Sequence, residues 1–274
     1  DALQNARRLF SAAKGGHTGT LDPLATGLLP LCFGEATKFS ADLLDADKTY
    51  EAVVRLGVCT DTGDAEGAVI GTAAVDVAED DVFRVLPQFT GVIRQVPPMH
   101  SALKRNGRQL YELARQGIEI ERESRIVTIH AIDCLGFGGD RLTLRVACSK
   151  GTYIRVLVAD IGQALGCGAH LAGLRRTRVG DLGLDSAVTL PQLEALGEVG
   201  RAGCLRPVDA LLRSLPAVAL QGEAAERFRH GNPVDLPAGP SGKIRVYVDG
   251  TLIGVGESAA DGRLWPRRLV HLTH

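Results

Sequence analysis

The chain has 274 residues, enough for about two domains, and 45% of them are hydrophobic, so at least one sizeable core is expected. Its 31 basic and 32 acidic side chains nearly cancel, which excludes a global positive field that would attract nucleic acid or anionic lipid. Any RNA or DNA must therefore bind to a local basic patch. No apolar run approaches the roughly 20 residues that span a bilayer, and the amino end has no signal-peptide pattern, so we expect a cytoplasmic protein with no membrane partner.

Helical and strand patterns alternate through the first two thirds of the chain. Residues 1–14 have apolar side chains at helical spacing and are expected to form a helix capped by Asp1. Residues 47–58 alternate apolar and polar side chains, which predicts a half-buried strand, and turn residues follow it. Further helices are expected over 78–86, ending near Pro87, over 108–117, ending at Gly117, and over 153–166.

The remaining patterns indicate consecutive strands. Residues 125–137 and 141–151 resemble a hairpin joined through Gly138, Gly139 and Asp140. The predicted fold class is therefore α+β, with a mixed, mainly antiparallel sheet. After about residue 213 the runs become short and are separated by Gly, Asn-Pro and Asp-Gly, which is typical of a small β-rich module. We therefore expect one domain over residues 1–213 and a second over 214–274.

The stretch GGHTGTLDPLATG, residues 15–27, surrounds Asp22 with glycines that permit close approach by a ligand or another part of the chain. It is not a phosphate-binding P-loop, because no Gly-Lys-Ser/Thr ends the glycine run, and the chain has no G-x-S-x-G elbow of a serine hydrolase. An aspartate in such a loop is often a plain turn residue. The loop alone therefore favours a structural turn, and a functional carboxylate needs a second feature to support it.

A second feature is CSKGTYIRVL, residues 148–157, in which Arg155 lies near the expected amino end of a helix. The helix macrodipole disfavours a cation there, so a carboxylate partner would explain its position. Tyr153 and Tyr50 belong to the same candidate set. Spacing alone does not bring these residues together, and a surface position for Arg155 stays open.

The six cysteines are expected to be structural, because no CxxC pair is present and Cys167 with His170 is at most half of a zinc site.

Four long stretches, in order, closely resemble the bacterial tRNA pseudouridine-55 synthases, the TruB family. They are GGHTGTLDPLATGLLPLCFGEATKFS, DKTYEAVVRLG, PPMHSALKRNGRQLYELARQG and CSKGTYIRVLVADIGQALGCGAHLAGLRRTRVG. The end of the chain, from RHGNPV through WPRRLV, resembles that family's PUA-type RNA-binding domain. The resemblance implies a pseudouridine synthase fold and conversion of uridine 55 in the T-loop of tRNA to pseudouridine. It implies no metal and no cofactor.

The resemblance also implies roles for individual residues. Asp22 matches the catalytic aspartate that attacks the target uridine, and Tyr50 matches the tyrosine that stacks on the flipped base and takes part in proton transfer. Arg155 matches the arginine that pairs with the aspartate; a guanidinium favours the ionised form of a neighbouring carboxyl, as a nucleophile requires. Tyr153 and Leu174 match residues that line the pocket, and His17 matches the residue that enters the RNA stack where the base has left.

RNA is expected to be held by local basic clusters. Residues 98–117 resemble the family's insertion that closes over the T-arm, and the phosphate-contact candidates there are Lys104, Arg105 and Arg108. Two further clusters comprise Arg175, Arg176 and Arg178, and Arg267 and Arg268. Each cluster taken singly is also typical of a solvated surface. The family has an early Lys-Pro strand ahead of its first helix, whereas this sequence begins at that helix, so that strand is expected to be missing here.

Two other functions remain open at this stage. One is a non-catalytic RNA-binding or RNA-folding protein with the same fold, against which the joint presence of Asp22, Tyr50 and Arg155 argues. The other is a guide-RNA-dependent synthase subunit. The insertion over 98–117 and the lack of a lysine-rich tail favour the stand-alone bacterial type, acting as a monomer on tRNA.

Overall fold

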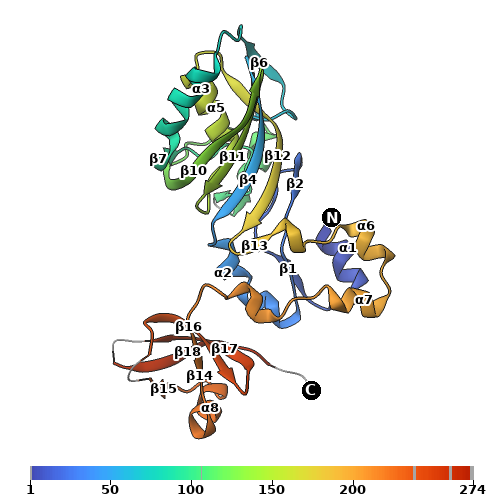
Figure 1. The fold of residues 1–274 in the computed structure, drawn as a ribbon, viewed down its shortest axis with the longest axis vertical. Coiled ribbons are helices and arrows are strands. Elements are labelled where there is room, and N and C mark those ends of the chain that lie inside the picture. The colour runs from blue at the N-terminus through green and yellow to red at the C-terminus, as the bar shows by residue number, and fades with distance from the viewer. Residues whose placement is uncertain (1, 106, 237–238, 259–260, 272–274) are drawn as a thin grey trace. The chain divides into compact units, whose positions relative to one another are not determined.

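The computed structural model describes residues 2–105, 107–236, 239–258 and 261–271 (Figure 1). The chain divides into two compact units. The large-sheet unit comprises Thr20–Leu29 and Asp45–Asp185, and the C-terminal unit comprises Asp1–Gly19, Pro30–Leu44 and Ser186–His274. The division into these units reflects contacts between residues and not functional domains. The predicted domain boundary between 1–213 and 214–274 therefore stays a prediction.

The large-sheet unit is built on a mixed sheet, which within the described residues has seven strands in the order β13-β12-β4-β11-β10-β7, with β2 also pairing with β12. Its neighbours are antiparallel except for β2 and β12, which are parallel. The predicted α+β class with a mainly antiparallel sheet is confirmed. The strands are β2 (Ala25–Gly27), β4 (Lys48–Leu56), β7 (Gly91–Gln95), β10 (Arg125–Gly138), β11 (Arg141–Cys148), β12 (Ala169–Val179) and β13 (Leu182–Gly183).

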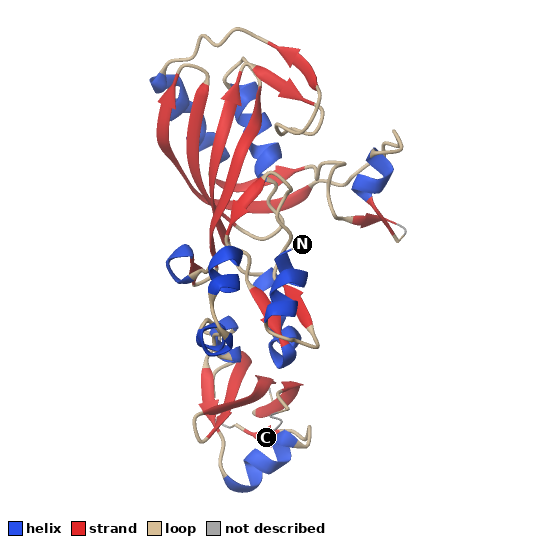
Figure 2. Cartoon of the chain, turned by 90° about the vertical axis from the view of Figure 1, so that its right-hand side faces the viewer, coloured by secondary structure: helices blue, strands red, loops and turns tan. Residues whose placement is uncertain are grey.

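One face of this sheet forms the core because alternate side chains of its central strands point the same way. On β4 the buried hydrophobic residues are Ala52, Val54 and Leu56, as the alternation predicted, and Lys48 at the start of the strand is buried too. Helix α5 (Ile154–Ala164) lies over this face and buries Leu157 and Ile161 against it (Figures 1 and 2). Helix α3 (Glu79–Val85) and the 3-10 helix η2 (Leu86–Phe89) complete the cover. The predicted hairpin of β10 and β11 is confirmed.

Three predicted helices have different ends in the structure. Helix α1 (Ala2–Leu9) ends early because Ser11 has a φ of 48°, which no α-helix accommodates, and the expected cap Asp1 lies outside the described residues. The helix that was expected to stop near Pro87 continues as η2, in which proline occupies the first turn and needs no N–H. Helix α4 (Leu110–Ala114) starts two residues late and ends at Ala114, three residues before Gly117.

The residues before α4 explain its late start, because they belong to a small hairpin of β8 (Lys104–Arg105) and β9 (Arg108–Gln109). Gly117, with a φ of 71°, follows α4 in the left-handed conformation that was predicted to end this helix. A second small hairpin pairs β5 (Val58–Thr60) with β6 (Val69–Thr72).

The C-terminal unit contains the β-rich module that was expected after residue 213. Its described residues form a five-stranded sheet in the order β14-β16-β17-β18-β15, with Phe228, Ile244, Val246 and Leu264 in its core. The strands are β14 (Ala217–Ala219), β15 (Val234–Asp235), β16 (Gly242–Val248), β17 (Thr251–Ser258) and β18 (Arg263–Leu269), and the helix is α8 (Gly222–Arg229). The unit also contains β1 (Gly15–His17), β3 (Leu31–Phe33), η1 (Gly34–Phe39), α2 (Ser40–Leu44), α6 (Leu190–Ala195), α7 (Glu198–Gly203) and η4 (Val208–Leu211). The residues of η3 (Leu184–Ser186) are divided between the two units.

All six cysteines are free thiols, of which Cys32, Cys148 and Cys167 are buried. Burial raises the pKa of the Cys32 and Cys148 thiols to about 11, so both are protonated and unreactive at neutral pH. None of the helices in the described part of the chain is both long enough and apolar enough to cross a membrane.

Strand β2 is short and depends on a glycine for its contact with β12. Gly27 has a φ of 97°, and a Cβ atom there would lie 2.2 Å from the carbonyl oxygen of Arg176. The next residue, Leu28, donates its N–H to that same oxygen at 2.7 Å, and the Arg176 side chain returns a hydrogen bond from Nε to the Leu28 carbonyl at 2.8 Å. Only glycine allows the chain to approach β12 this closely.

We therefore expect Gly27→Ala to detach residues 25–28 from β12. Gly139→Ala is the matched control, because Gly139 also has a positive φ, of 60°, but nothing lies within 4 Å of its added methyl group. The control should lose about 1–2 kcal/mol of unfolding free energy from backbone strain alone. Only Gly27→Ala should speed amide hydrogen exchange over residues 25–29, as measured by mass spectrometry. Unchanged protection of the Leu28 amide in Gly27→Ala would contradict this account of β2.

Candidate active site

Asp22 lies in a tight turn immediately before β2. Its carbonyl accepts a hydrogen bond from the N–H of Ala25 at 2.8 Å, and Pro23 occupies the second position of the turn, where its fixed φ is favourable. The glycine-rich loop therefore ends in a defined conformation that presents the Asp22 side chain, which is 35% exposed.

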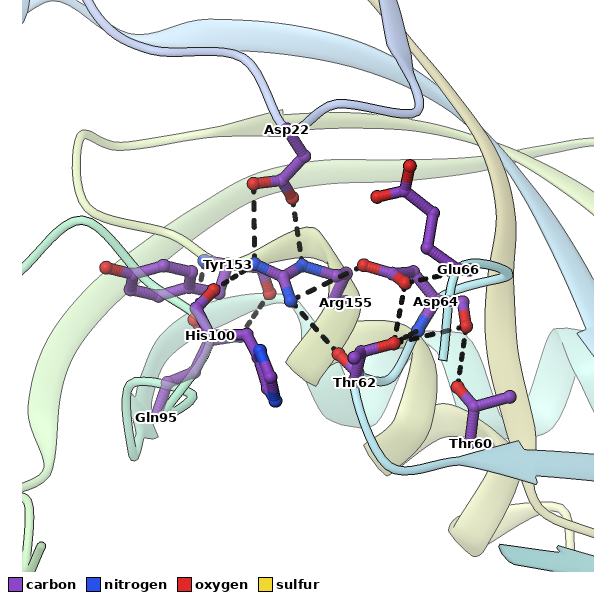
Figure 3. A network of polar contacts seen from close by, with 9 residues as sticks. All are labelled: Asp22, Thr60, Thr62, Asp64, Glu66, Gln95, His100, Tyr153 and Arg155. Atoms are coloured by element: carbon purple, nitrogen blue, oxygen red, sulfur yellow. Dashed lines mark hydrogen bonds and ion pairs between the residues drawn. The ribbon is translucent and has the colours of Figure 1, made fainter. Parts of the chain in front are cut away.

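Arg155 is the second residue of α5 and points its guanidinium at Asp22 (Figure 3). Its Nε donates to Asp22 Oδ2 at 2.9 Å and its Nη2 donates to Asp22 Oδ1 at 3.3 Å, which is a two-pronged contact. The remaining N–H groups donate to the carbonyls of Thr62, at 3.0 Å, and His100, at 2.7 Å. The predicted carboxylate partner of Arg155 is thus present, and the alternative of a surface arginine is wrong, because Arg155 is 4% exposed.

A second carboxylate, Asp64, lies 3.5 Å from Nη1 of Arg155 and was not identified from the sequence. The Thr62 hydroxyl and the N–H of Glu66 both donate to its Oδ1, at 2.6 and 3.1 Å (Figure 3). The sequence DTGDAEG signalled only a turn. Asp64 is the buried residue of this turn, which pairs with β12: Ala65 donates to the Leu171 carbonyl, and Leu171 donates to the Gly63 carbonyl. No local pattern in the sequence predicts that burial.

The two carboxylates differ in access. The side chain of Asp64 is 5% exposed and that of Asp22 is 35% exposed, so only Asp22 can touch a bound molecule. Asp64 and the carbonyls of Thr62 and His100 contact Arg155 and hold its guanidinium in place. Arg155 in turn fixes both oxygens of Asp22. The arrangement can therefore present an oriented carboxylate as a nucleophile or as a base.

Gln95 and Tyr153 fix the start of α5. Tyr153 is the residue before the first turn of this helix, and it donates its N–H to Gln95 Oε1 at 3.0 Å. Gln95 Nε2 donates in return to the Tyr153 carbonyl at 3.3 Å. Gln95 was not among the residues singled out from the sequence, and its side chain is buried at the end of β7.

Tyr50 lies on β4, and its register partner on the neighbouring strand β12 is Arg176. Burial raises the pKa of the Tyr50 phenol above its usual value, the positive charge and hydrogen bond of Arg176 oppose that rise, and the negative charge of Asp22 adds to it. Tyr50 is therefore protonated at neutral pH and lies within electrostatic reach of Asp22. Leu174 is 9% exposed and pairs with Ala52 on one side and with Ala25 on the other, so it joins β4 to β2.

The expectation of a surface position is wrong for Arg176, which is 1% exposed. Its side chain points into the unit, toward Tyr50 and the Leu28 carbonyl, because alternate residues of β12 face inward. The other phosphate-contact candidates are exposed. They are Lys104, Arg105, Arg108, Arg175, Arg178, Arg267 and Arg268. His17 is exposed at the end of β1, in the C-terminal unit.

Across the residues that the structure describes, there is no group of three or more His, Cys, Asp or Glu side chains that could hold a metal ion. His170 contacts the Val58 carbonyl through Nδ1 at 2.9 Å.

Three family models match consecutive parts of the chain. Residues 7–154 match the N-terminal domain of TruB family pseudouridylate synthases, and residues 155–213 match the C-terminal domain of tRNA pseudouridylate synthase B. Residues 216–270 match a model described as the C-terminal part of pseudouridine synthase II TruB.

Similar proteins agree with these matches. The tRNA pseudouridine synthase B of Dechloromonas aromatica is 75% identical over 99% of this chain and 91% of its own length. That of Aromatoleum aromaticum is 58% identical over 98% of this chain and 87% of its own. A chain in the crystal structure of a Cbf5–Nop10–Gar1 complex has a TM-score of 0.71 and 29% identity, over 92% of this chain and 72% of that one. The chain belongs to the TruB family of pseudouridylate synthases.

Proposed function

We propose that this protein isomerises uridine 55 in the T-loop of tRNA to pseudouridine. The observation that carries the proposal is the two-pronged contact between Asp22 and Arg155, which joins residues 133 positions apart and leaves one face of the carboxylate exposed. Membership of the TruB family supports the reaction class, and the names of the similar proteins support tRNA as the substrate.

In the proposed mechanism Asp22 attacks the target uridine and the bond from N1 of the base to the sugar breaks. Carbon 5 of the base then forms the new bond to the same sugar carbon as Asp22 is released, and the proton lost from carbon 5 is balanced by one gained at N1, so the reaction is an isomerisation. Arg155 orients the carboxylate, because its guanidinium donates a hydrogen bond to each of the two Asp22 oxygens. The base must first leave the helical stack, at a cost of a few kcal/mol. Stacking on Tyr50 would return about 1–3 kcal/mol of that cost, and its phenol, which is protonated at neutral pH, can exchange a proton with the base.

The other site residues are proposed to bind RNA. Tyr153 and Leu174 would line the pocket, and His17 would fill the space that the flipped base leaves. Lys104, Arg105, Arg108 and Arg175 are exposed and would contact phosphates, whereas the burial of Arg176 supports a role inside the pocket, next to Tyr50. Residues 214–274 would act as a PUA-type RNA-binding domain.

Asp22, Tyr50 and Arg155 all belong to the large-sheet unit, which supports a complete site in one chain. We therefore infer that the enzyme works as a monomer, and we propose that it acts in the cytoplasm without a cofactor.

The direct test is to incubate the purified protein with an unmodified tRNA transcript and to map pseudouridine at nucleotide resolution. The proposal expects modification at position 55 with no added protein, guide RNA or metal. Binding without product would indicate an RNA-folding protein, and product only with a guide RNA would indicate a guide-dependent subunit.

We expect Asp22→Asn to lower the single-turnover rate by roughly 1,000-fold or more and to leave tRNA affinity nearly unchanged, since phosphate contacts supply most of the binding. Asp140→Asn is the matched control, because Asp140 forms a surface ion pair with Arg55 and should be dispensable for the reaction. Rates at saturating tRNA and filter-binding affinities measure both effects. Pseudouridine formation by Asp22→Asn at the rate of the control would refute the assignment of the nucleophile.

We expect Tyr50→Phe to keep the stacking face and tRNA binding but to slow product formation by about 100-fold, because the hydroxyl is lost. Tyr50→Leu should weaken binding as well, since the aromatic face is also lost. Base entry can be followed with a fluorescent uridine analogue in the T-loop. If Tyr50→Phe retains the full rate, the proton is transferred by water or by another group.

We expect Arg155→Lys to lower the single-turnover rate by about 100-fold although the charge is kept, because an ammonium cannot hold two carboxylate oxygens and two carbonyls in one plane. Arg145→Lys is the matched control, since Arg145 is half-exposed and pairs with Glu51 on the sheet surface. Combining Arg155→Lys with Asp22→Asn should add little, because the two residues act as a unit. Additive losses in the double variant would show that they act separately.

A further inference from the structure

Gln95 is a buried polar residue, 2% exposed. Both polar atoms of its side-chain amide form hydrogen bonds with the backbone of a single residue, Tyr153. Its oxygen accepts from the N–H of Tyr153 and its nitrogen donates to the carbonyl of Tyr153, at 3.0 and 3.3 Å (Figure 3). A side-chain amide is suited to this exchange, because it carries a donor and an acceptor side by side. The backbone of Gln95 is itself fixed in β7, opposite Arg125 of β10.

The residue that Gln95 holds is the one from which α5 begins. The Tyr153 carbonyl also accepts the first hydrogen bond of the helix, from the N–H of Leu157 at 3.1 Å. The Tyr153 side chain makes no capping hydrogen bond at this end of α5, and the N–H of Tyr153 is satisfied by Gln95. A shift of Tyr153 would therefore move the first turn, and Arg155 is in that turn.

Arg155 is sensitive to such a shift for two reasons. Its positive charge lies at the amino end of a helix, where the macrodipole disfavours it, so its position depends on its partners. Those partners come from separate segments, and one of them, the His100 carbonyl, is only five residues beyond Gln95. The segment from Gln95 to His100 thus holds α5 twice, through a side chain at Tyr153 and through a carbonyl at Arg155.

We propose that Gln95 is a positioning residue for the reaction. By exchanging two hydrogen bonds with Tyr153 it fixes the first turn of α5, and it thereby sets the distance and angle at which Arg155 presents Asp22 to the substrate. This inference rests on the proposed function of Asp22 and Arg155 and adds to it a residue that does not touch the reacting atoms.

The first test replaces the amide by an uncharged side chain of similar length. Gln95→Met should lower the single-turnover rate at saturating tRNA by about tenfold or more, since small misplacements of reacting groups are costly, while tRNA affinity changes little. Gln163→Met is the matched control, because Gln163 is exposed on the same helix. Thermal unfolding of both variants shows whether Gln95→Met is folded.

The second test distinguishes the hydrogen bonds from simple packing. In Gln95→Glu an ionised carboxylate can accept from the Tyr153 N–H but faces the Tyr153 carbonyl with no proton to donate. When protonated, the same carboxyl can donate and accept as the amide does. The rate of this variant relative to wild type should therefore rise by about tenfold as the pH falls from about 8.5 to 5.5, a range reached by buried carboxyls. Dividing the rate of the variant by the rate of wild type at the same pH removes effects of the groups that both proteins share, including Asp22, Asp64 and His100.

The outcomes distinguish a failure of the Gln95 positioning role from a failure of the proposed function. No pseudouridine from wild type would refute the proposed function. With an active wild type, a Gln95→Met rate equal to that of Gln163→Met would overturn the positioning role. So would a Gln95→Glu ratio that does not change with pH, even if Gln95→Met fails to fold. A slow Gln95→Met enzyme with normal tRNA affinity, together with a Gln95→Glu enzyme that recovers at low pH, is the expected result.

Discussion

The site depends on the burial of one guanidinium. Removing an arginine from water is costly unless its charge and its N–H groups are matched, and Arg155 is matched by Asp22, Asp64 and the carbonyls of Thr62 and His100. These four partners come from three segments of the chain, since Thr62 and Asp64 share one turn. Each segment is therefore held in place by the need to satisfy the same cation, and the exposed face of Asp22 is what remains available for chemistry.

A second buried arginine fixes the same loop from its other end. Arg155 binds the loop at Asp22, and Arg176 binds it at the carbonyl of Leu28, six residues later. One arginine comes from a helix and the other from a strand, so the loop spans two elements of the large-sheet unit. Arg176 also lies beside Tyr50 in the register of β12 and β4, which connects the position of the loop to that of the aromatic ring.

The sequence predicted what local patterns determine. The alternation on β4, the hairpin of β10 and β11 and the periodicity of α5 were sufficient for the fold class. The position of Arg155 near a helix start indicated a carboxylate partner. Asp64 and Gln95 were missed because their burial arises from strands distant in sequence. Arg176 could have been placed, because strand alternation puts it on the inner face with Leu174, but its neighbours Arg175 and Arg178 made the stretch resemble a surface cluster.

The parallel pairing of β2 with β12 has a consequence for how the enzyme becomes active as it folds. Three residues of β2 pair with residues about 150 positions later, and little else in so short a strand can compensate the entropy of closing that loop. The antiparallel hairpin of β10 and β11 is local and has no such cost. The sheet can therefore be largely formed while the Asp22 loop is still free. In a refolding chain, the spectroscopic signal of the sheet would therefore return before the Asp22 carboxylate is held in its working position.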